Sequence, residues 1–104
     1  AVHSIRRGRA EALEIVAHGD KHTSRVVGRK IKDIGLPDSC RIGLIVRGLP
    51  NNQRNPLAQT VDPVVINATP DTEIQSGDHA IIFVSERRQV LSVEKLFRVK
   101  PTFF

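Results

Sequence analysis

The sequence contains no methionine, tryptophan or tyrosine, and it has a single cysteine, Cys40. One cysteine cannot form an internal disulfide, so the fold does not depend on a disulfide framework, as suits a reducing compartment. No apolar run approaches the roughly 20 residues that a membrane-spanning helix requires. The basic residues 1–9 are not followed by the apolar stretch of a secretory signal. Because methionine is absent even from position 1, we expect the chain to be a piece of a longer protein or a processed product. The tail 98–104, which follows the last periodic segment, indicates a C-terminal domain.

Basic residues exceed acidic ones, with a net charge of +5. Such a balance invites a nucleic-acid-binding interpretation. Three arginines, however, lie within residues 1–9, and the rest of the chain carries 13 basic against 11 acidic residues. With tyrosine and tryptophan absent, no basic and aromatic stacking platform is apparent. Nucleic-acid binding is therefore the weakest of the functions we consider.

The hydrophobic pattern predicts one α+β domain with a mixed, mainly antiparallel sheet of four to five strands and two helices. Alternating apolar residues indicate strands, and apolar residues three or four apart indicate helices. The expected strands are 10–18, 41–47, 63–68 and 79–85, and the expected helices are 25–34 and 86–97. We expect residues 1–9 to be a linker or the end of a preceding domain, 10–97 to be the domain, and 98–104 to be a tail.

The first predicted helix, 25–34, rests on three apolar positions and on its ends. Val27, Ile31 and Ile34 fall on one helical face. Thr23 or Ser24 can accept hydrogen bonds from the first amides, and Gly35 suits the left-handed position after a helix. Gly28 is unfavourable inside a helix, by about 1 kcal/mol relative to alanine.

No group of residues predicts catalysis or metal binding. His18 and His22 flank a Gly-Asp turn, which does not provide the spacing of a helical zinc site. Cys40 precedes an apolar strand, where a half-buried side chain is the usual role. Asp20 and Asp78 lie at turns, where aspartate caps backbone amides. We therefore expect no enzyme activity, no catalytic residue and no metal.

Two pairs of residues are candidates for binding. Arg25, at a predicted helix start, and Arg47, at a strand end, could meet an anionic effector or an acidic partner; ordinary surface arginines are the alternative. The strands around Ile45 and Val65 are apolar on both faces, so one face can pack on the domain's own helices and the other on a second copy. We therefore predict a dimer interface at Ile45 and Val65.

The ordered set of segments 24–37, 42–48 and 74–84 resembles the C-terminal module of the regulator-of-potassium-conductance family, the TrkA-C or RCK-C domain. The resemblance covers the chain from Ala10 onward. It implies a regulatory domain, often paired with a twin, on a cytosolic subunit that forms a ring on a membrane-embedded potassium transporter. That subunit lies at the inner face of the plasma membrane.

The resemblance also implies where cofactors would bind. NAD(H) or ATP is expected on a Rossmann-like domain that is absent from this chain, since no Gly-x-Gly-x-x-Gly motif follows a strand here. Some relatives bind cyclic di-AMP through a basic residue after the first helix; Pro37 and Asp38 stand there, so we expect no such binding. The segment 48–62 is an insertion relative to the family's tight hairpin. A ligand-sensing module of another transporter or of a transcription regulator is the alternative function.

Overall fold

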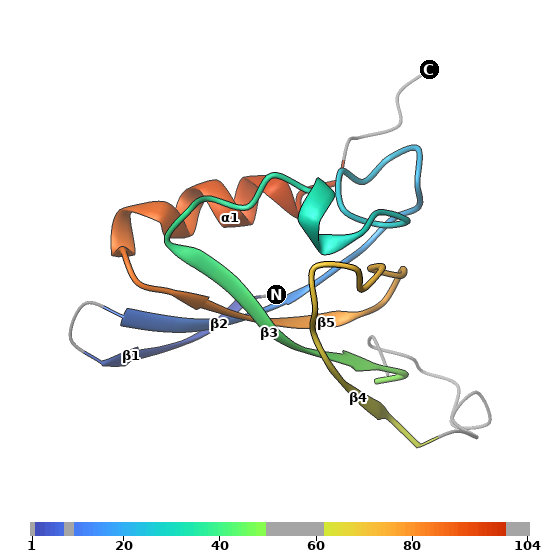
Figure 1. Cartoon of the computed structure of the whole chain (residues 1–104), viewed down its shortest axis with the longest axis horizontal. Helices are drawn as coiled ribbons and strands as arrows, with labels where there is room; N and C mark the ends of the chain where they lie inside the picture. Colours follow the sequence, from blue (N-terminus) through green and yellow to red (C-terminus); the bar gives the residue numbers. More distant parts are fainter. Residues whose placement is uncertain (1, 8–9, 50–61, 100–104) are drawn as a thin grey trace.

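The protein is described by a computed structural model for residues 2–7, 10–49 and 62–99, with side chains from Glu11 onward within these ranges. A five-stranded sheet carries a helical layer on one face (Figure 1). The strands are β1 (Val2–Arg7), β2 (Ala10–Val16), β3 (Cys40–Arg47), β4 (Val64–Asn67) and β5 (His79–Val84). Two 3-10 turns, η1 (Ile31–Asp33) and η3 (Arg87–Gln89), and one α-helix, α1 (Val90–Leu96), complete the described elements.

The sheet has the order β1-β2-β5-β3-β4, and each of these neighbouring pairs is antiparallel. The predicted α+β class and strand number are confirmed, and the four predicted strands match β2 to β5 within two residues at each end. β5 lies in the centre because both of its faces carry apolar residues. A register shift between Ile42 and Leu44 on β3 marks a bulge opposite β5.

The strand β1 was not predicted. Residues 2–7 pair with β2 along its whole length, Val2 with Ile15 and Arg7 with Ala10. The three arginines within residues 1–9 favoured a linker, because charge suggested a solvated segment. An edge strand needs no apolar face of its own, since its backbone hydrogen bonds to β2 hold it in place.

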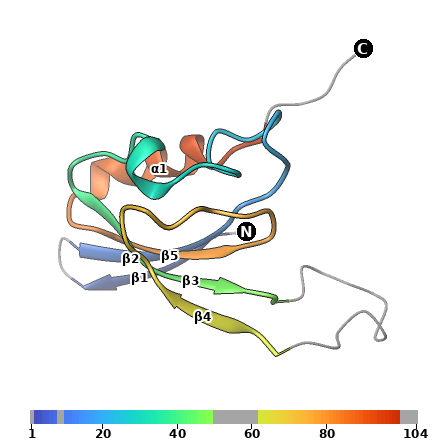
Figure 2. The same ribbon diagram turned by 45° about the vertical axis from the view of Figure 1, so that its right-hand side comes forward.

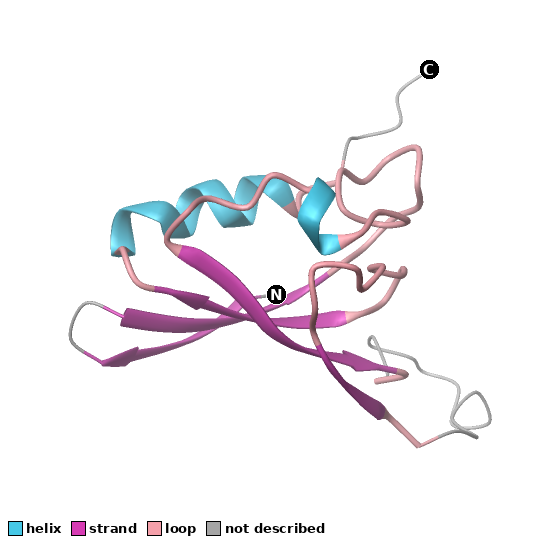
Figure 3. Cartoon of the chain, viewed as in Figure 1, coloured by secondary structure: helices cyan, strands magenta, loops and turns pink. Residues whose placement is uncertain are grey.

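The predicted helix 25–34 is wrong. This segment forms successive turns, with a single 3-10 turn at Ile31–Asp33. Gly28 has a φ of +80°, which a right-handed helix does not allow. The second predicted helix, 86–97, is present as η3 followed by α1 (Figure 3).

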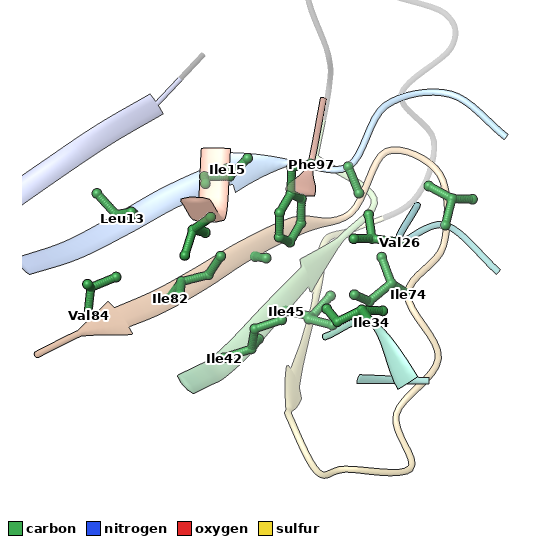
Figure 4. Close-up of a cluster of buried hydrophobic side chains, with 14 residues drawn as sticks. Leu13, Ile15, Val26, Ile34, Ile42, Ile45, Ile74, Ile82, Val84 and Phe97 are labelled. Atoms are coloured by element: carbon green, nitrogen blue, oxygen red, sulfur yellow. The ribbon is translucent and has the colours of Figure 1, made fainter. Parts of the chain in front are cut away.

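The core lies between the sheet and the layer formed by α1 and residues 19–37 (Figures 1 and 2). Val27 and Ile34 are buried in it and Ile31 packs against it, so the apolar positions predicted for a helix are core positions of a turn-rich segment. Figure 4 shows that Leu13, Ile82 and Phe97 come from β2, β5 and the end of α1. The opposite face of the sheet is not covered by any of the described residues.

Candidate functional site: a pocket between η1, β3 and the 68–70 segment

The backbone of η1 forms one side of the pocket and is hydrogen-bonded to the segment 70–73. The Ile31 amide donates to the Thr72 carbonyl over 2.9 Å, and the Lys32 amide donates to the Pro70 carbonyl over 3.0 Å. On the other side, the Ala68 amide donates to the Gly43 carbonyl at the β3 bulge over 3.1 Å. Residues 31–43 and residues 68–72, which are distant in the sequence, are thereby held around one hollow.

The hollow is a cavity of about 510 Å³, within the range of small-molecule sites. Its lining consists of Ile31, Lys32, Leu36, Cys40, Arg41, Ile42, Ala68, Thr69 and Pro70. Apolar side chains thus predominate, and two basic residues and a threonine lie among them. Such a lining fits a small organic anion with an apolar body better than a bare ion.

The basic residues of the pocket differ in their partners. The Lys32 ammonium lies 3.0 Å from the Asp71 carboxylate, and this contact raises the pKa of Lys32 and lowers that of Asp71. Arg41 is exposed and forms no hydrogen bond or ion pair with the part of the chain that the structure describes. Of the two cations, Arg41 is therefore the one without a described partner, at the rim of the pocket where its side chain alternates with the buried Ile42.

Cys40 lines the same pocket and is half-buried. Burial raises the pKa of its thiol, and its Sγ lies 3.7 Å from the Ser39 hydroxyl. A raised pKa leaves less thiolate at neutral pH, which is the opposite of what an attacking cysteine requires.

Arg47, a candidate for effector binding, is occupied within the fold. Its Nε and one terminal nitrogen each donate to the Asp78 carboxylate over 2.9 Å, and that nitrogen also donates to the Glu73 carbonyl over 3.1 Å. Asp78 is fully buried. Its bidentate hydrogen bond raises the pKa of Arg47 further. The guanidinium therefore fastens the end of β3 to the turn before β5 and is not presented to a ligand.

Arg25, the other effector candidate, lies outside the pocket. Its side chain is exposed and the helix expected to begin there is absent. The predicted capping by Ser24 is nevertheless confirmed, because its hydroxyl accepts from the Val26 and Val27 amides, each over 3.1 Å. The structure thus brings neither Arg25 nor Arg47 into the cavity.

Of the two residues predicted at a dimer interface, Ile45 has no exposed surface and lies in the core. Its side chain is not available to a second copy. Val65 is 63% exposed and lies on the uncovered face of the sheet. The dimer hypothesis therefore rests on Val65 and not on Ile45.

Asp20 and Asp78 cap backbone amides as predicted. One Asp20 oxygen accepts from the His22 and Thr23 amides over 2.9 and 3.0 Å, which lowers the pKa of Asp20. Asp78 accepts from the Gln75 amide over 2.8 Å. No group of three metal-binding side chains occurs among the residues with described positions.

The pocket residues Lys32, Arg41 and Thr69 were missed by sequence reasoning. They come from three separate segments, and no spacing in the sequence connects them. The sequence pattern predicts only the turn Thr69-Pro70-Asp71-Thr72, and a turn alone does not indicate a cavity.

The fold and the pocket define a small α+β module with a ligand-sized cavity and an uncovered sheet face. No family model matches the chain. Several curated proteins are similar to it. Over 103 residues it is 47% identical to the Trk system potassium uptake protein TrkA of Halomonas elongata, and over 102 residues it is 44% identical to that of Vibrio alginolyticus. The Haemophilus influenzae protein of the same name is 40% identical over 102 residues.

These matches cover 98–99% of the chain but only 19–20% of each relative. The chain is thus homologous to about a fifth of a TrkA protein, and the resemblance found in the sequence is confirmed. No helix within the described ranges is long and apolar enough to span a bilayer.

Proposed function

We propose that the chain is the C-terminal regulatory domain of a TrkA-type subunit that controls potassium uptake. The observation that carries this proposal is the 47% identity over almost the entire chain to a protein named for potassium uptake. In this proposal the subunit is cytoplasmic and lies against a membrane-embedded potassium transporter, as a dimer or a larger ring. NAD(H) or ATP binds another domain of the parent protein, and this domain catalyses no reaction.

The domain regulates by binding an effector and by associating with a second copy. The pocket beside η1 supports the first of these roles, because its volume suits a small molecule and Arg41 has no partner among the described residues. The effector is a small organic anion whose apolar part lies against Ile42 and Leu36. Its occupancy would add contacts to the backbone hydrogen bonds that already hold η1 against residues 70–72.

A chimaeric protein tests the role in potassium uptake. The matching 103 residues of the Halomonas elongata TrkA are replaced by this chain, and the chimaera is produced in cells that lack their own TrkA. We expect potassium uptake to be restored. Deletion of the same segment serves as the control and should not restore it. A chimaera that accumulates intact and gives no uptake would contradict the proposal.

A thermal-shift screen of the purified chain tests effector binding. Nucleotides, other organic anions and cations are the probes, because a ligand that prefers the folded state raises the melting temperature. We expect an anionic probe to raise it, and Arg41→Glu to abolish the shift. Arg25→Glu is the matched control, since Arg25 is exposed but outside the cavity. Equal loss in both variants would show non-specific charge attraction and contradict a site in the pocket.

A further inference from the structure

The side of α1 that is turned away from the sheet carries basic side chains around one exposed leucine. Figure 3 shows α1 lying along one face of the sheet, and Val93 is its buried residue. The exposed residues are spaced three, four and three apart, as on one side of a helix. They are Arg88, Leu91, Lys95 and Arg98, and we call them the α1 face. The Arg98 amide donates to the Lys95 carbonyl over 3.2 Å, so the chain keeps turning through Arg98.

The charges of the α1 face are accessible to an external partner. The side chains of Lys95 and Arg98 form no hydrogen bond or ion pair with the residues that the structure describes. Arg88 Nε lies 2.6 Å from the Glu86 carboxylate, but the Arg88 side chain is 78% exposed. An ion pair so open to water contributes little and is readily exchanged for another. Leu91, between these cations, is 64% exposed.

Charge is distributed unevenly between the helical layer and the rest of the molecule. Residues 19–37 and 85–98, which form the layer on the sheet (Figure 2), contain nine Lys and Arg against four Asp and Glu. The remaining described residues, which include all five strands, contain four Lys and Arg against seven Asp and Glu. A negatively charged surface therefore attracts the layer and repels the rest, which orients the molecule with α1 towards that surface.

The composition of the α1 face suits a lipid surface better than a protein. Protein partners are usually bound through a central cluster of apolar anchors. Among the described residues of α1, Leu91 is the only large apolar side chain that is exposed. At a membrane surface, Lys and Arg place their charged ends at the lipid phosphates while their apolar stems lie along the lipids. Basic side chains around an apolar residue are typical of helices that lie on membranes.

We propose that the α1 face binds the surface of a bilayer that contains anionic phospholipids. Leu91 lies at the level of the headgroups, and the three cations of the face contact lipid phosphates. The proposal goes beyond the proposed function, which places the parent subunit against a transporter and not against lipid. Each Lys or Arg near an anionic membrane strengthens binding about fivefold, so three of them together give about a hundredfold.

Two matched pairs of variants separate the α1 face from the rest of the surface. Lys95→Gln removes a cation from the face, and Lys30→Gln removes one outside it, 4.0 Å from the Asp71 carboxylate. Both substitutions change the net charge equally. Leu91→Ser and Val64→Ser form the second pair, at 64% and 53% exposed positions, and Val64 lies on the edge strand β4. Because all four sites are exposed, each variant should retain the fold, which circular dichroism checks.

Co-sedimentation with large vesicles measures binding of the 104-residue chain. The vesicles contain phosphatidylglycerol and phosphatidylcholine in equal parts, and vesicles of phosphatidylcholine alone are the reference. We expect binding to the anionic vesicles only, and its loss at about 1 M salt, where the screening length falls to ~3 Å. Lys95→Gln and Leu91→Ser should each weaken binding about fivefold. Lys30→Gln and Val64→Ser should leave it nearly unchanged.

Three outcomes would overturn the proposal. The first is that the unmodified chain does not bind the anionic vesicles. The second is equal weakening by Lys95→Gln and Lys30→Gln, which would indicate general charge attraction. The third is binding to immobilised polyglutamate that is tighter than binding to the vesicles and is lost in Leu91→Ser, which would assign the α1 face to an acidic protein. Vesicle binding is measured without a transporter, so a failure here and a failure in potassium uptake can be told apart.

Discussion

At the scale of single residues, the Arg47–Asp78 contact ties a fully buried carboxylate to the end of β3. Asp78 is fully buried and accepts two hydrogen bonds from Arg47 and one from the Gln75 amide. Removing one member of such a pair leaves a buried charge without compensation. The exposed Lys32–Asp71 pair has no comparable role, since water solvates either partner alone.

Asp78→Ala should therefore lower the free energy of unfolding by about 3 kcal/mol. Arg47→Ala should cost a similar amount, and the double variant should cost less than the sum of the two, because it leaves neither charge alone. Urea denaturation measures these differences. Asp71→Ala is the control and should leave the transition unchanged. Additive effects at Arg47 and Asp78 would show that the pair is not coupled.

At the scale of elements, residues 25–34 show how a helical pattern can arise without a helix. The Gly28 amide donates to the Ile74 carbonyl over 2.7 Å, and the Ile74 amide donates to the Arg29 carbonyl over 3.0 Å. The backbone is thus paired largely with residues 70–74, and the hydrogen bonds within the segment span three residues, as in turns, and not the four of an α-helix. Val27, Ile31 and Ile34 still face the core, because successive turns also return the chain to one side.

The effect of Gly28→Ala has opposite signs for a helix and for the observed turn. In a helix the change would stabilise the protein by about 1 kcal/mol. At a φ of +80° we expect destabilisation by about 1 kcal/mol or more. Gly35→Ala is the matched control: φ is +76° there, and an added Cβ would meet no atom within 4 Å, so its cost is conformational alone. A more stable Gly28→Ala variant in thermal denaturation would contradict the structure.

The strands were predictable and the layer above them was only partly so. Apolar side chains alternate along residues 41–47 and 79–85. In a pleated strand every second side chain points to the same face, so this pattern predicts which side chains are buried. β1 left no such signal because its place depends on backbone pairing with β2. The role of Arg47 could not be predicted either, since Asp78 is 31 residues away in the sequence and only the fold brings the two together.

At the scale of the whole molecule, the pocket and the exposed apolar side chains of the sheet lie in different places. The pocket opens beside η1 and the start of β3, whereas Val65 and Phe83 are exposed on the face turned away from α1.

Cys40 reports on the integrity of the pocket, because the cavity exists only when three separate segments are assembled. Burial raises its pKa above the ordinary 9.0, so the thiolate fraction at neutral pH is lower in the folded protein than in the unfolded chain. We expect a thiol reagent to modify the native protein more slowly than the urea-unfolded protein, and the native rate to rise as the pH approaches the raised pKa.

An effector found in the thermal-shift screen should slow the modification of native Cys40 further without changing the rate in the unfolded protein. Equal rates of thiol modification in the native and unfolded states would show that the Cys40 thiol is not enclosed. An effector that raises the melting temperature but leaves the native modification rate unchanged must bind outside the pocket.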